Sequence, residues 1–355
     1  MGHNHHILFD LFPPPEFLRM PSIGLDVSDE VVRFAQLIRK RNLFELGIYG
    51  EKKIPRDVIE EGYIKDKASL TKTLDGLRRQ YGLRYVRASL PEEKSYLFRT
   101  TVPAMASADI RNAVRFKIEE NVPVTLDSAI FDYRIINQPT PENNRIDLSV
   151  TVIHTKVVSN YLEVFRAAGL EPLEFRIESH AIAHALVAPN DYNTYIVIMV
   201  RETKTVLAIV SRGIVQFSST LTTGGDAITA SIKKNLSVDD NEAAKIRRGK
   251  ESRDSNEMFL SLMSAATMLR DEIQKLFAYW DGHSTGDHQS IDSVIISGSD
   301  SLLGLDDYLS RSLKVPVQIA DVWKNIAPIG DYVPSLVRRE ALDYVPALGL
   351  ALPYD

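Results

Sequence analysis

Hydrophobic and polar residues alternate in two separate blocks of this 355-residue chain, as they do along half-buried β-strands. In each block three short runs follow one another with connections of a few residues, which is the pattern of an antiparallel meander. The predicted strands are 23–27, 31–38 and 43–49 in the first block, and 195–200, 206–210 and 214–217 in the second. Each meander is followed by segments of helical periodicity. The chain is therefore predicted to contain two related halves.

The helical segments carry recognisable end signals. The helix predicted at 67–81 buries one face and ends at Gly82, a residue suited to the position after a helix. Ser107 is predicted as an N-cap, and Ser237 with Asp240 as another. Further helices are predicted at 110–123, 156–168, 256–279 and up to 313, and further strands at 89–99, 131–133, 146–153 and 294–297.

The composition narrows the class of protein. With 44% hydrophobic and 25% charged residues, the chain is an ordinary globular protein that is long enough for two domains. The absence of cysteine excludes disulfide bonds and thiolate metal sites, and a net charge of −5 gives no reason to expect nucleic-acid binding. The longest apolar run, 195–200, is far shorter than the ~20 residues that span a bilayer. We expect a soluble, intracellular protein without direct membrane insertion, in which residues 1–21 form a flexible tail.

The sequence carries no signature of an enzyme active site. The patterns Gly-x-Ser-x-Gly and His-Glu-x-x-His and the Walker phosphate loop are absent from it. His180 and His184 lie one helical turn apart, but no third ligand is near them in the sequence. We therefore predict neither catalytic residues nor a metal site.

The segment from Ser89 to Tyr133 is the most informative part of the chain. It joins a strand pair (Ser89-Leu90-Pro91 to Phe98-Arg99), a helix that ends in Glu119-Glu120-Asn121-Val122-Pro123, and a strand with Phe131-Asp132-Tyr133. In this order the segments resemble the inserted subdomain of the PilM family of type IV pilus assembly proteins. That family is actin-like and is related to FtsA and to the cytoplasmic domain of GspL. The resemblance extends from about residue 22 to 353.

The resemblance implies an α/β fold. Two duplicated actin-like (ribonuclease H-like) halves would face each other, and a small α+β subdomain would be inserted into the first half and packed on it. The implied boundaries are 22–61 and 170–193 for the first half, 62–169 for the inserted subdomain, 194–224 and 291–355 for the second half, and 225–290 for a helical subdomain.

A nucleotide cleft between the halves is also implied. The residues that match the family's cleft are Gly24, Asp26, Ser28, Gly224, Gly225, Glu272, Lys275, Gly298, Ser299 and Gly304. The phosphate hairpins depart from the family, because Asp29 and Glu30 stand where a triphosphate would be bound, and Met199 and Arg201 replace an aspartate and a glycine. We therefore expect ATP to bind weakly or not at all, magnesium not to be held, and ATP not to be hydrolysed.

The family's pattern for partner binding is better kept, in Glu120, Val122, Pro123, Asp132 and Tyr133. In the family, an N-terminal cytoplasmic peptide of the membrane protein PilN lies in a groove between the inserted subdomain and the first half. The resemblance thus implies a cytoplasmic scaffold of a type IV pilus platform, held at the inner face of the membrane by a PilN-like protein and other platform proteins. Two alternatives stay open: a working ATPase with nucleotide-gated partner binding, and a GspL-type secretion-system domain.

Overall fold

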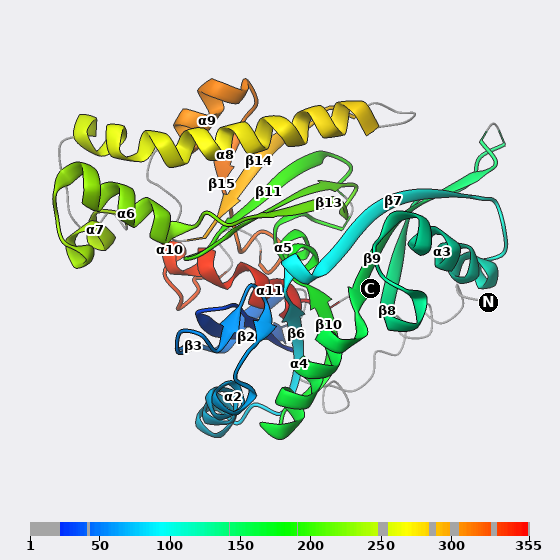
Figure 1. The fold of residues 1–355 in the computed structure, drawn as a ribbon, viewed down its shortest axis with the longest axis horizontal. Helices are drawn as coiled ribbons and strands as arrows, with labels where there is room; N and C mark the ends of the chain where they lie inside the picture. The colour runs from blue at the N-terminus through cyan, green and yellow to red at the C-terminus, as the bar shows by residue number, and fades with distance from the viewer. Residues whose placement is uncertain are drawn as a thin grey trace.

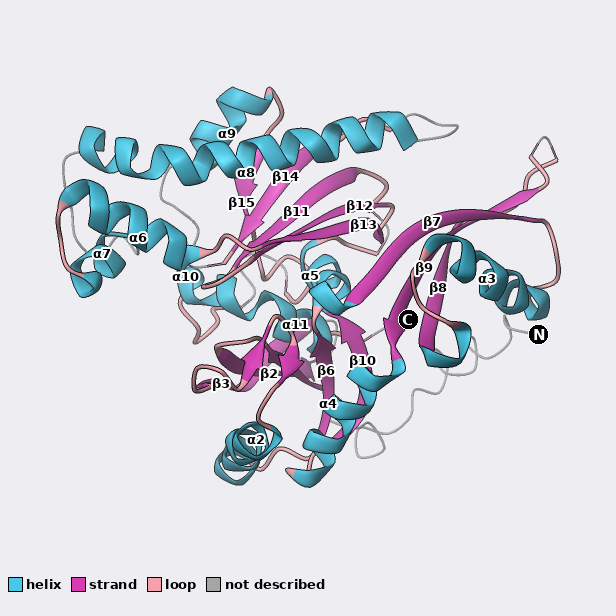
Figure 2. Ribbon diagram, in the orientation of Figure 1, coloured by secondary structure: helices cyan, strands magenta, loops and turns pink. Residues whose placement is uncertain are grey.

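Two five-stranded sheets and a smaller three-stranded sheet form the framework of the molecule (Figure 1). The computed structural model describes residues 22–40, 43–141, 143–189, 191–247, 255–283, 289–298, 305–327 and 332–353. Figure 2 shows a layered arrangement, in which α8 and α9 cover one face of the second sheet, α5 and α11 lie between the two large sheets, and α2 and α4 cover the far face of the first sheet.

The first sheet has the order β10-β6-β1-β2-β3. Its strands are β1 (Ser22–Val27), β2 (Val31–Lys40), β3 (Leu43–Lys53), β6 (Tyr85–Leu90) and β10 (Glu171–Ile177). The predicted meander is confirmed in β1, β2 and β3, which pair antiparallel, whereas β6 and β10 add parallel strands. The other elements of this half are β4 (Ile59–Glu60), β5 (Tyr63–Ile64), α2 (Lys67–Tyr81), α4 (Thr155–Ala167) and α5 (Glu178–Leu186).

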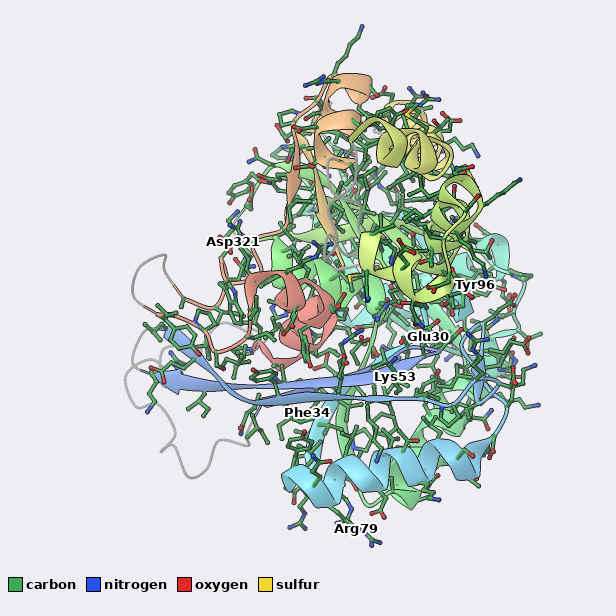
Figure 3. All side chains as sticks on the ribbon, turned by 90° about the vertical axis from the view of Figure 1, so that its left-hand side faces the viewer. Glu30, Phe34, Lys53, Arg79, Tyr96 and Asp321 are labelled. Atoms are coloured by element: carbon green, nitrogen blue, oxygen red, sulfur yellow. The ribbon has the colours of Figure 1, made fainter. Side chains whose placement is uncertain are left out.

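The sequence of α2 explains why it forms and where it packs. Asp66 caps its start by accepting the backbone N–H of Ser69 at 3.0 Å, and Gly82 ends it in the left-handed conformation, with φ of 68°. Leu70, Leu74 and Leu77 are buried on its sheet-facing side. Phe34 of β2 points toward this helix and completes the core between them (Figure 3).

The second sheet has the order β13-β12-β11-β14-β15. Its strands are β11 (Thr194–Val200), β12 (Thr205–Ser211), β13 (Ile214–Leu221), β14 (Ser293–Ser297) and β15 (Val317–Ile319). Strand β11 is apolar along its length because both faces are covered: Ile196 and Ile198 pack toward the outer helices, and Val197 and Met199 toward α5 and α11. The helices of this half are α6 (Gly225–Leu236), α7 (Asp240–Arg247), α8 (Ser255–His283) and α9 (Leu305–Leu313).

The third sheet has its own core and lies in the sequence between β6 and α4. Its order is β7-β9-β8, so β7 and β8 are its edges. Helix α3 packs Ile110, Val114 and Ile118 against Leu148 and Val150 of the central strand. The elements are η2 (Glu92–Lys94), β7 (Ser95–Pro103), α3 (Ser107–Asn121), η3 (Leu126–Ser128), β8 (Ala129–Asn137) and β9 (Arg145–His154). We call the unit from β7 to β9 the small subdomain.

The structure corrects the predicted boundaries at two places. The range 62–169 is too wide for a separate subdomain, because β6 pairs with β1 in the first sheet and α2 and α4 pack on that sheet. The range 291–355 does not belong wholly to the second half either, because α11 packs against β1 and α5. The final segments are α10 (Arg338–Ala341), η4 (Leu342–Tyr344) and α11 (Val345–Ala351).

Two predicted caps are also wrong. Ser107 is the first residue of α3 rather than its cap, which is Ala106 without a side-chain hydrogen bond. Ser237 ends α6 in the left-handed conformation, and the side chain of Asp239 instead accepts the N–H of Glu242 at 2.8 Å to begin α7. Asp and Ser are both good N-caps, so the residue type alone does not fix which one is used.

The small subdomain makes its non-covalent contacts mainly with the second half, not with the first as predicted. The Ser149 hydroxyl donates to the Val215 carbonyl of β13 at 2.7 Å, and Arg212 donates to the Asn137 side chain at 2.6 Å. The Arg99 guanidinium lies 5.5 Å from the centre of the Trp280 ring of α8. These contacts fasten the subdomain to the second half.

Candidate functional site

A cluster of buried charges fills the space between the two halves where the resemblance places phosphates. Arg201, in the β11–β12 turn, places Nη2 2.8 Å from Oδ2 of Asp26 on β1 and donates from Nε to Glu178 of α5. Lys204, in the same turn, lies 3.1 Å from Oε2 of Glu178 and 2.7 Å from Oε2 of Glu93. We call these five residues the charge clamp. It joins β1, η2 and α5 on one side to the β11–β12 turn on the other.

Within the charge clamp, neighbouring opposite charges favour the charged forms of Glu178 and Arg201. Burial alone would raise the pKa of the Glu178 carboxyl, but Arg201 and Lys204 outweigh it and lower the pKa. Burial alone would lower the pKa of Arg201, and the carboxylates of Asp26 and Glu178 raise it instead. The side chains of Asp26, Glu178 and Arg201 are 1, 4 and 3% exposed, so water does little to screen these pairs.

The start of α6 is closed by the same turn. The N–H groups of Gly225 and Asp226, which would be the donors of an anion site, bond to the carbonyls of Arg201 and Glu202, each at 2.8 Å. A Cβ on Gly224 would lie 2.4 Å from the Glu202 carbonyl oxygen, so glycine is needed here for the turn to pack on the helix. Gly224 and Gly225, which were predicted to bind nucleotide, thus contact the β11–β12 turn of the protein itself.

Two other predicted glycines have the same explanation. A Cβ on Gly24 would lie 1.9 Å from the carbonyl oxygen of Ala347 in α11, and one on Gly298 would lie 2.0 Å from that of Val200. Gly298 also has φ of 95°, where other residues are strained. Ser28 forms hydrogen bonds to Val31 within its own turn, at 3.0 Å to the carbonyl and 3.3 Å from the N–H.

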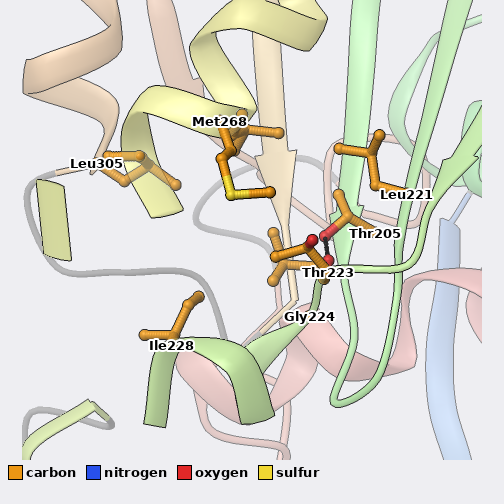
Figure 4. A pocket seen from close by; sticks show the side chains of 10 residues that line it. Thr205, Leu221, Thr223, Gly224, Ile228, Met268 and Leu305 are labelled. Atoms are coloured by element: carbon orange, nitrogen blue, oxygen red, sulfur yellow. Dashed lines mark hydrogen bonds between the residues drawn. The ribbon is translucent and has the colours of Figure 1, made fainter. Parts of the chain in front are cut away.

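A small cavity of about 30 Å³ lies between α6, α8 and α9 (Figure 4) and is lined mainly by apolar residues, among them Leu221, Ile228 and Leu305. A volume of this size holds about two water molecules. Glu272 and Lys275 pair with each other at 2.5 Å on α8. Ser299 and Gly304 lie outside the described residues.

A larger cleft of about 930 Å³ opens on the other side of the charge clamp. Ser28, Asp29 and Glu30 line it from the β1–β2 turn, and Arg201 and Glu202 from the second half. Burial raises the pKa of Asp29, although Lys204 acts against this. Glu30 accepts a hydrogen bond from the Thr203 hydroxyl across the cleft. Its walls carry charges of both signs and no concentration of positive charge that would suit a triphosphate.

A groove of about 720 Å³ lies between the small subdomain and the first half. One wall is residues 130–135 of β8, and the other is 174–177 of β10 together with α5. Both β8 and β10 are edge strands of their sheets. Consecutive side chains of a strand point to opposite faces, so the six consecutive residues of β8 bring its backbone edge into the groove. Ser149, Thr151 and Ile153, alternate residues of the central strand β9, also line it, so the groove extends over the sheet face opposite α3 as well. The groove therefore has a strand edge on each side.

The chain's family follows from comparison with known proteins. The family described as "Type IV pilus assembly protein PilM" matches residues 24–354. The chain belongs to this family. Its role accordingly lies in the assembly of type IV pili. None of the curated proteins matches the chain.

Solved structures share its fold at low sequence identity. The "PilM-PilN type IV pilus biogenesis complex" matches with a TM-score of 0.76 and 19% identity over 94% of this chain and 98% of that chain. The ethanolamine utilization protein EutJ from Carboxydothermus hydrogenoformans gives 0.56 and 15% over 94% and 89%. MreB5 of Spiroplasma citri bound to AMPPNP gives 0.53 and 12% over 94% and 95%. The predicted actin-like α/β fold is thereby confirmed.

Two of the five residues matched to partner binding line the groove of this PilM-family chain. Asp132 is exposed at its wall, and Tyr133 lines it while packing in part against the core of the small subdomain. The other three are at the end of α3, outside the groove: Glu120 pairs with Lys117 at 2.7 Å, Val122 is buried in that core, and Pro123 is exposed.

The residues of the opposite wall of the groove were not predicted from the sequence. Its charged residues are on β10, where Arg176 pairs with Glu174 at 2.5 Å. Its histidines are on α5, where Nδ1 of His184 donates to the Gly349 carbonyl at 2.8 Å. Burial, and then Arg176, lowers the pKa of His180 to about 4. Burial also lowers that of His184 to about 4, despite its bond to Gly349. Both histidines are therefore neutral at pH 7.

We expect the protein to lose stability between pH 6.5 and pH 4 because of His180 and His184. In the unfolded chain each binds a proton near its ordinary pKa of 6.5, whereas in the folded chain neither does so until about pH 4. The unfolded state thus binds more protons in this range, and the free energy of unfolding should fall by roughly 2–4 kcal/mol between pH 7 and pH 5. Urea unfolding at both values measures the loss.

The matched comparison is the His180→Gln/His184→Gln variant, which should lose less stability over the same range. Comparison with this variant is needed because burial raises the pKa of Asp29 and Glu92, which act in the opposite sense. Equal losses in the two proteins would show that these histidines are not responsible.

In the part of the chain that the structure describes, no helix is both long and apolar enough to cross a membrane. The same described residues contain no group of three or more His, Asp or Glu side chains placed to hold a metal ion.

Proposed function

We propose that this chain is a cytoplasmic scaffold of a type IV pilus inner-membrane platform, and that its groove binds the N-terminal peptide of a PilN-like membrane protein. The observation that carries the proposal is the pair of edge strands, β8 and β10, facing one groove. An edge strand has unpaired N–H and C=O groups, and an extended peptide can pair with them as an added strand.

The dimensions of the groove suit a short extended peptide. Residues 130–135 of β8 offer six positions along one wall, and a strand rises about 3.3 Å per residue, so about six peptide residues could pair there. Ile130 and Phe131 provide apolar contacts, while Asp132, Arg134 and Glu174 provide charges of both signs. Main-chain pairing would supply affinity, and these side chains would supply specificity.

This function explains how a chain without a spanning helix in its described part would reach the membrane. The PilN-like peptide would hold it at the inner face, and other platform proteins would contact the remaining surface. The solved complex of this fold is titled as one of PilM with PilN, which supports the choice of partner. We assign no role in nucleic-acid binding, in keeping with the net charge of −5.

The direct test uses a fluorescent synthetic peptide with the first twelve residues of the PilN-like protein encoded in the same genome. We expect saturable binding to the full chain, measured by fluorescence anisotropy, and no saturable binding of a peptide with the same residues in scrambled order. Equal binding of the two peptides, or no binding of either, would contradict the proposal.

We further propose that ATP binds weakly or not at all, that magnesium is not held, and that ATP is not hydrolysed. The charge clamp supports this, because a triphosphate could reach Asp26 and Glu178 only by displacing Arg201 and Lys204 from them. Two buried carboxylates would then face the phosphates, and like charges repel strongly where water is scarce.

Titration calorimetry with Mg-ATP should accordingly give no measurable heat at concentrations up to about 1 mM, corresponding to a binding free energy weaker than about −4 kcal/mol. A positive control is a nucleotide-binding protein of the same fold measured in the same buffer. A micromolar dissociation constant for this chain would refute the expectation.

A further inference from the structure

The charge clamp and the groove are connected through specific residues. Glu178 is the first residue of α5, and the same helix lines the groove with His180, Ala183 and His184. Glu93 belongs to η2, which leads directly into β7 of the small subdomain. Between these two anchors, the Glu92 carboxylate accepts the N–H of Ser179 at 2.8 Å. The clamp thus holds the start of α5, which lines the groove, and the start of β7, the first strand of the small subdomain whose strand β8 forms the other wall.

The two walls of the groove also belong to different bodies. The wall made by β10 is part of the first sheet, whereas the wall made by β8 is part of the small subdomain. That subdomain is fastened to the second half by the Ser149–Val215 and Arg212–Asn137 hydrogen bonds. A rotation of one half against the other would therefore change the distance between the walls.

The charge clamp lies between the same two halves. Asp26 and Glu178 belong to the first half, and Arg201 and Lys204 to the second. Because these pairs are almost fully buried, separating the halves would leave unpaired charges in a poorly solvated site, which is strongly unfavourable. The clamp therefore favours one relative position of the halves.

We propose that the charge clamp sets the width of the peptide groove by fixing the two halves in one position, and that Lys204 and Glu93 act as positioning residues for partner binding. This inference rests on the proposed function of the groove. The clamp fixes the two halves at all times, whereas a nucleotide could fix them only while it is bound. Partner binding by this chain is therefore independent of nucleotide.

The test is the Lys204→Met/Glu93→Gln variant, which neutralises one cation and one anion and leaves the Arg201 pairs with Asp26 and Glu178 in place. We expect it to fold, with a Tm close to that of the wild type, and to bind the fluorescent peptide at least tenfold more weakly. Mg-ATP should change the affinity of neither protein. A folded variant with wild-type affinity would overturn the inference.

The control variant removes an exposed Lys–Asp ion pair that is not part of the clamp. Lys233 and Asp240 pair at 2.8 Å on the surface of the α6–α7 region, with 49 and 77% of their side chains exposed. Lys233→Met/Asp240→Asn should leave peptide affinity unchanged. If it weakens binding as much as the clamp variant, the effect is not specific to the clamp and the inference fails.

A rescue experiment separates positioning from general destabilisation. The chain has no cysteine, so Glu30→Cys/Thr203→Cys introduces a single pair, at two residues that touch across the cleft. Joining this pair with a short bismaleimide in the clamp variant should restore peptide affinity to within about threefold of the wild type. A crosslinked protein that still binds tenfold more weakly would show that the clamp does not act by fixing the halves.

Two further measurements keep the inference testable on its own. If the double variant does not fold, Glu93→Gln alone, which leaves Lys204 paired with Glu178, should reduce affinity about threefold, and unchanged affinity would count against the inference. Amide exchange without peptide should be faster in β8 and β10 of the clamp variant than in the wild type. If the wild type binds no peptide, the proposed function fails. If amide exchange in β8 and β10 is the same in both proteins, the inference about the clamp fails independently of peptide binding.

Discussion

Replacing Ile130 with glutamate is expected to weaken peptide binding by about 10- to 100-fold. Ile130 lies on β8, lines the groove and is 43% exposed, so a bound peptide would cover it. Covering the exposed 43% of this isoleucine contributes about 0.6–1.3 kcal/mol, and each 1.4 kcal/mol corresponds to a tenfold change in affinity. A glutamate would lose this contact and would bring an unpaired charge into the interface. The measurement is fluorescence anisotropy with the PilN-like peptide.

Phe116→Glu is the matched control for this variant. Phe116 is 70% exposed on α3 of the same small subdomain but does not line the groove. Both substitutions exchange an exposed apolar side chain for a carboxylate, so both proteins should keep a Tm near that of the wild type. If Phe116→Glu weakens binding and Ile130→Glu does not, the contact surface is on α3 and the groove is not the binding site.

The sequence specified local structure better than long-range pairing. The meanders β1–β2–β3 and β11–β12–β13 were predicted because strands joined by a few residues leave a local pattern. The place of β6 was not predicted, since it pairs in parallel with β1, a neighbour about sixty residues away in the sequence. Helix α11 was assigned to the wrong half for the same reason: its apolar residues show that it is buried but not against which sheet.

The glycines show why the sequence can mark where two groups come close without showing which groups they are. A glycine is needed wherever another group comes close to the backbone. That group can be a bound phosphate or a carbonyl oxygen of the protein, and the glycine is the same in both cases. At Gly24, Gly224 and Gly298 the close group is a protein carbonyl oxygen. The departure at Arg201 was visible in the sequence, but its partner Asp26 is 175 residues away and no pattern connects them.

The groove could be predicted on one side only. Asp132 and Tyr133 matched the family's pattern and do line it, because they are part of a compact unit with its own sequence pattern. The facing residues Glu174 and Arg176 are on β10, whose position as an edge strand depends on the topology of the whole first sheet. For a groove between two parts of the molecule, the sequence therefore predicted the residues of one wall, and the other wall is known only from the fold.

Replacing Arg201 with methionine is expected to lower the free energy of unfolding by about 3–5 kcal/mol, the loss typical of removing one partner of a buried ion pair. Asp26 and Glu178 would remain, 1 and 4% exposed, with only Lys204 near Glu178 to balance their charge. Urea unfolding at pH 7 measures the change. Added salt should not remove it, because ions do not reach a buried pair.

Two comparisons decide whether the loss comes from the unpaired carboxylates. In the Asp26→Asn/Arg201→Met variant, the asparagine side chain can still accept a hydrogen bond from the Ser89 hydroxyl, which lies 2.9 Å from Oδ1 of Asp26. The unpaired negative charge of Asp26 is removed. This double variant should therefore be more stable than Arg201→Met alone, although it has lost one more charged group. Lys233→Met, which breaks an exposed pair, should cost less than about 1 kcal/mol. If Arg201→Met costs no more than Lys233→Met, the pairs between the halves do not hold them together, and the cleft must be closed by the packing of α5 and α11 alone.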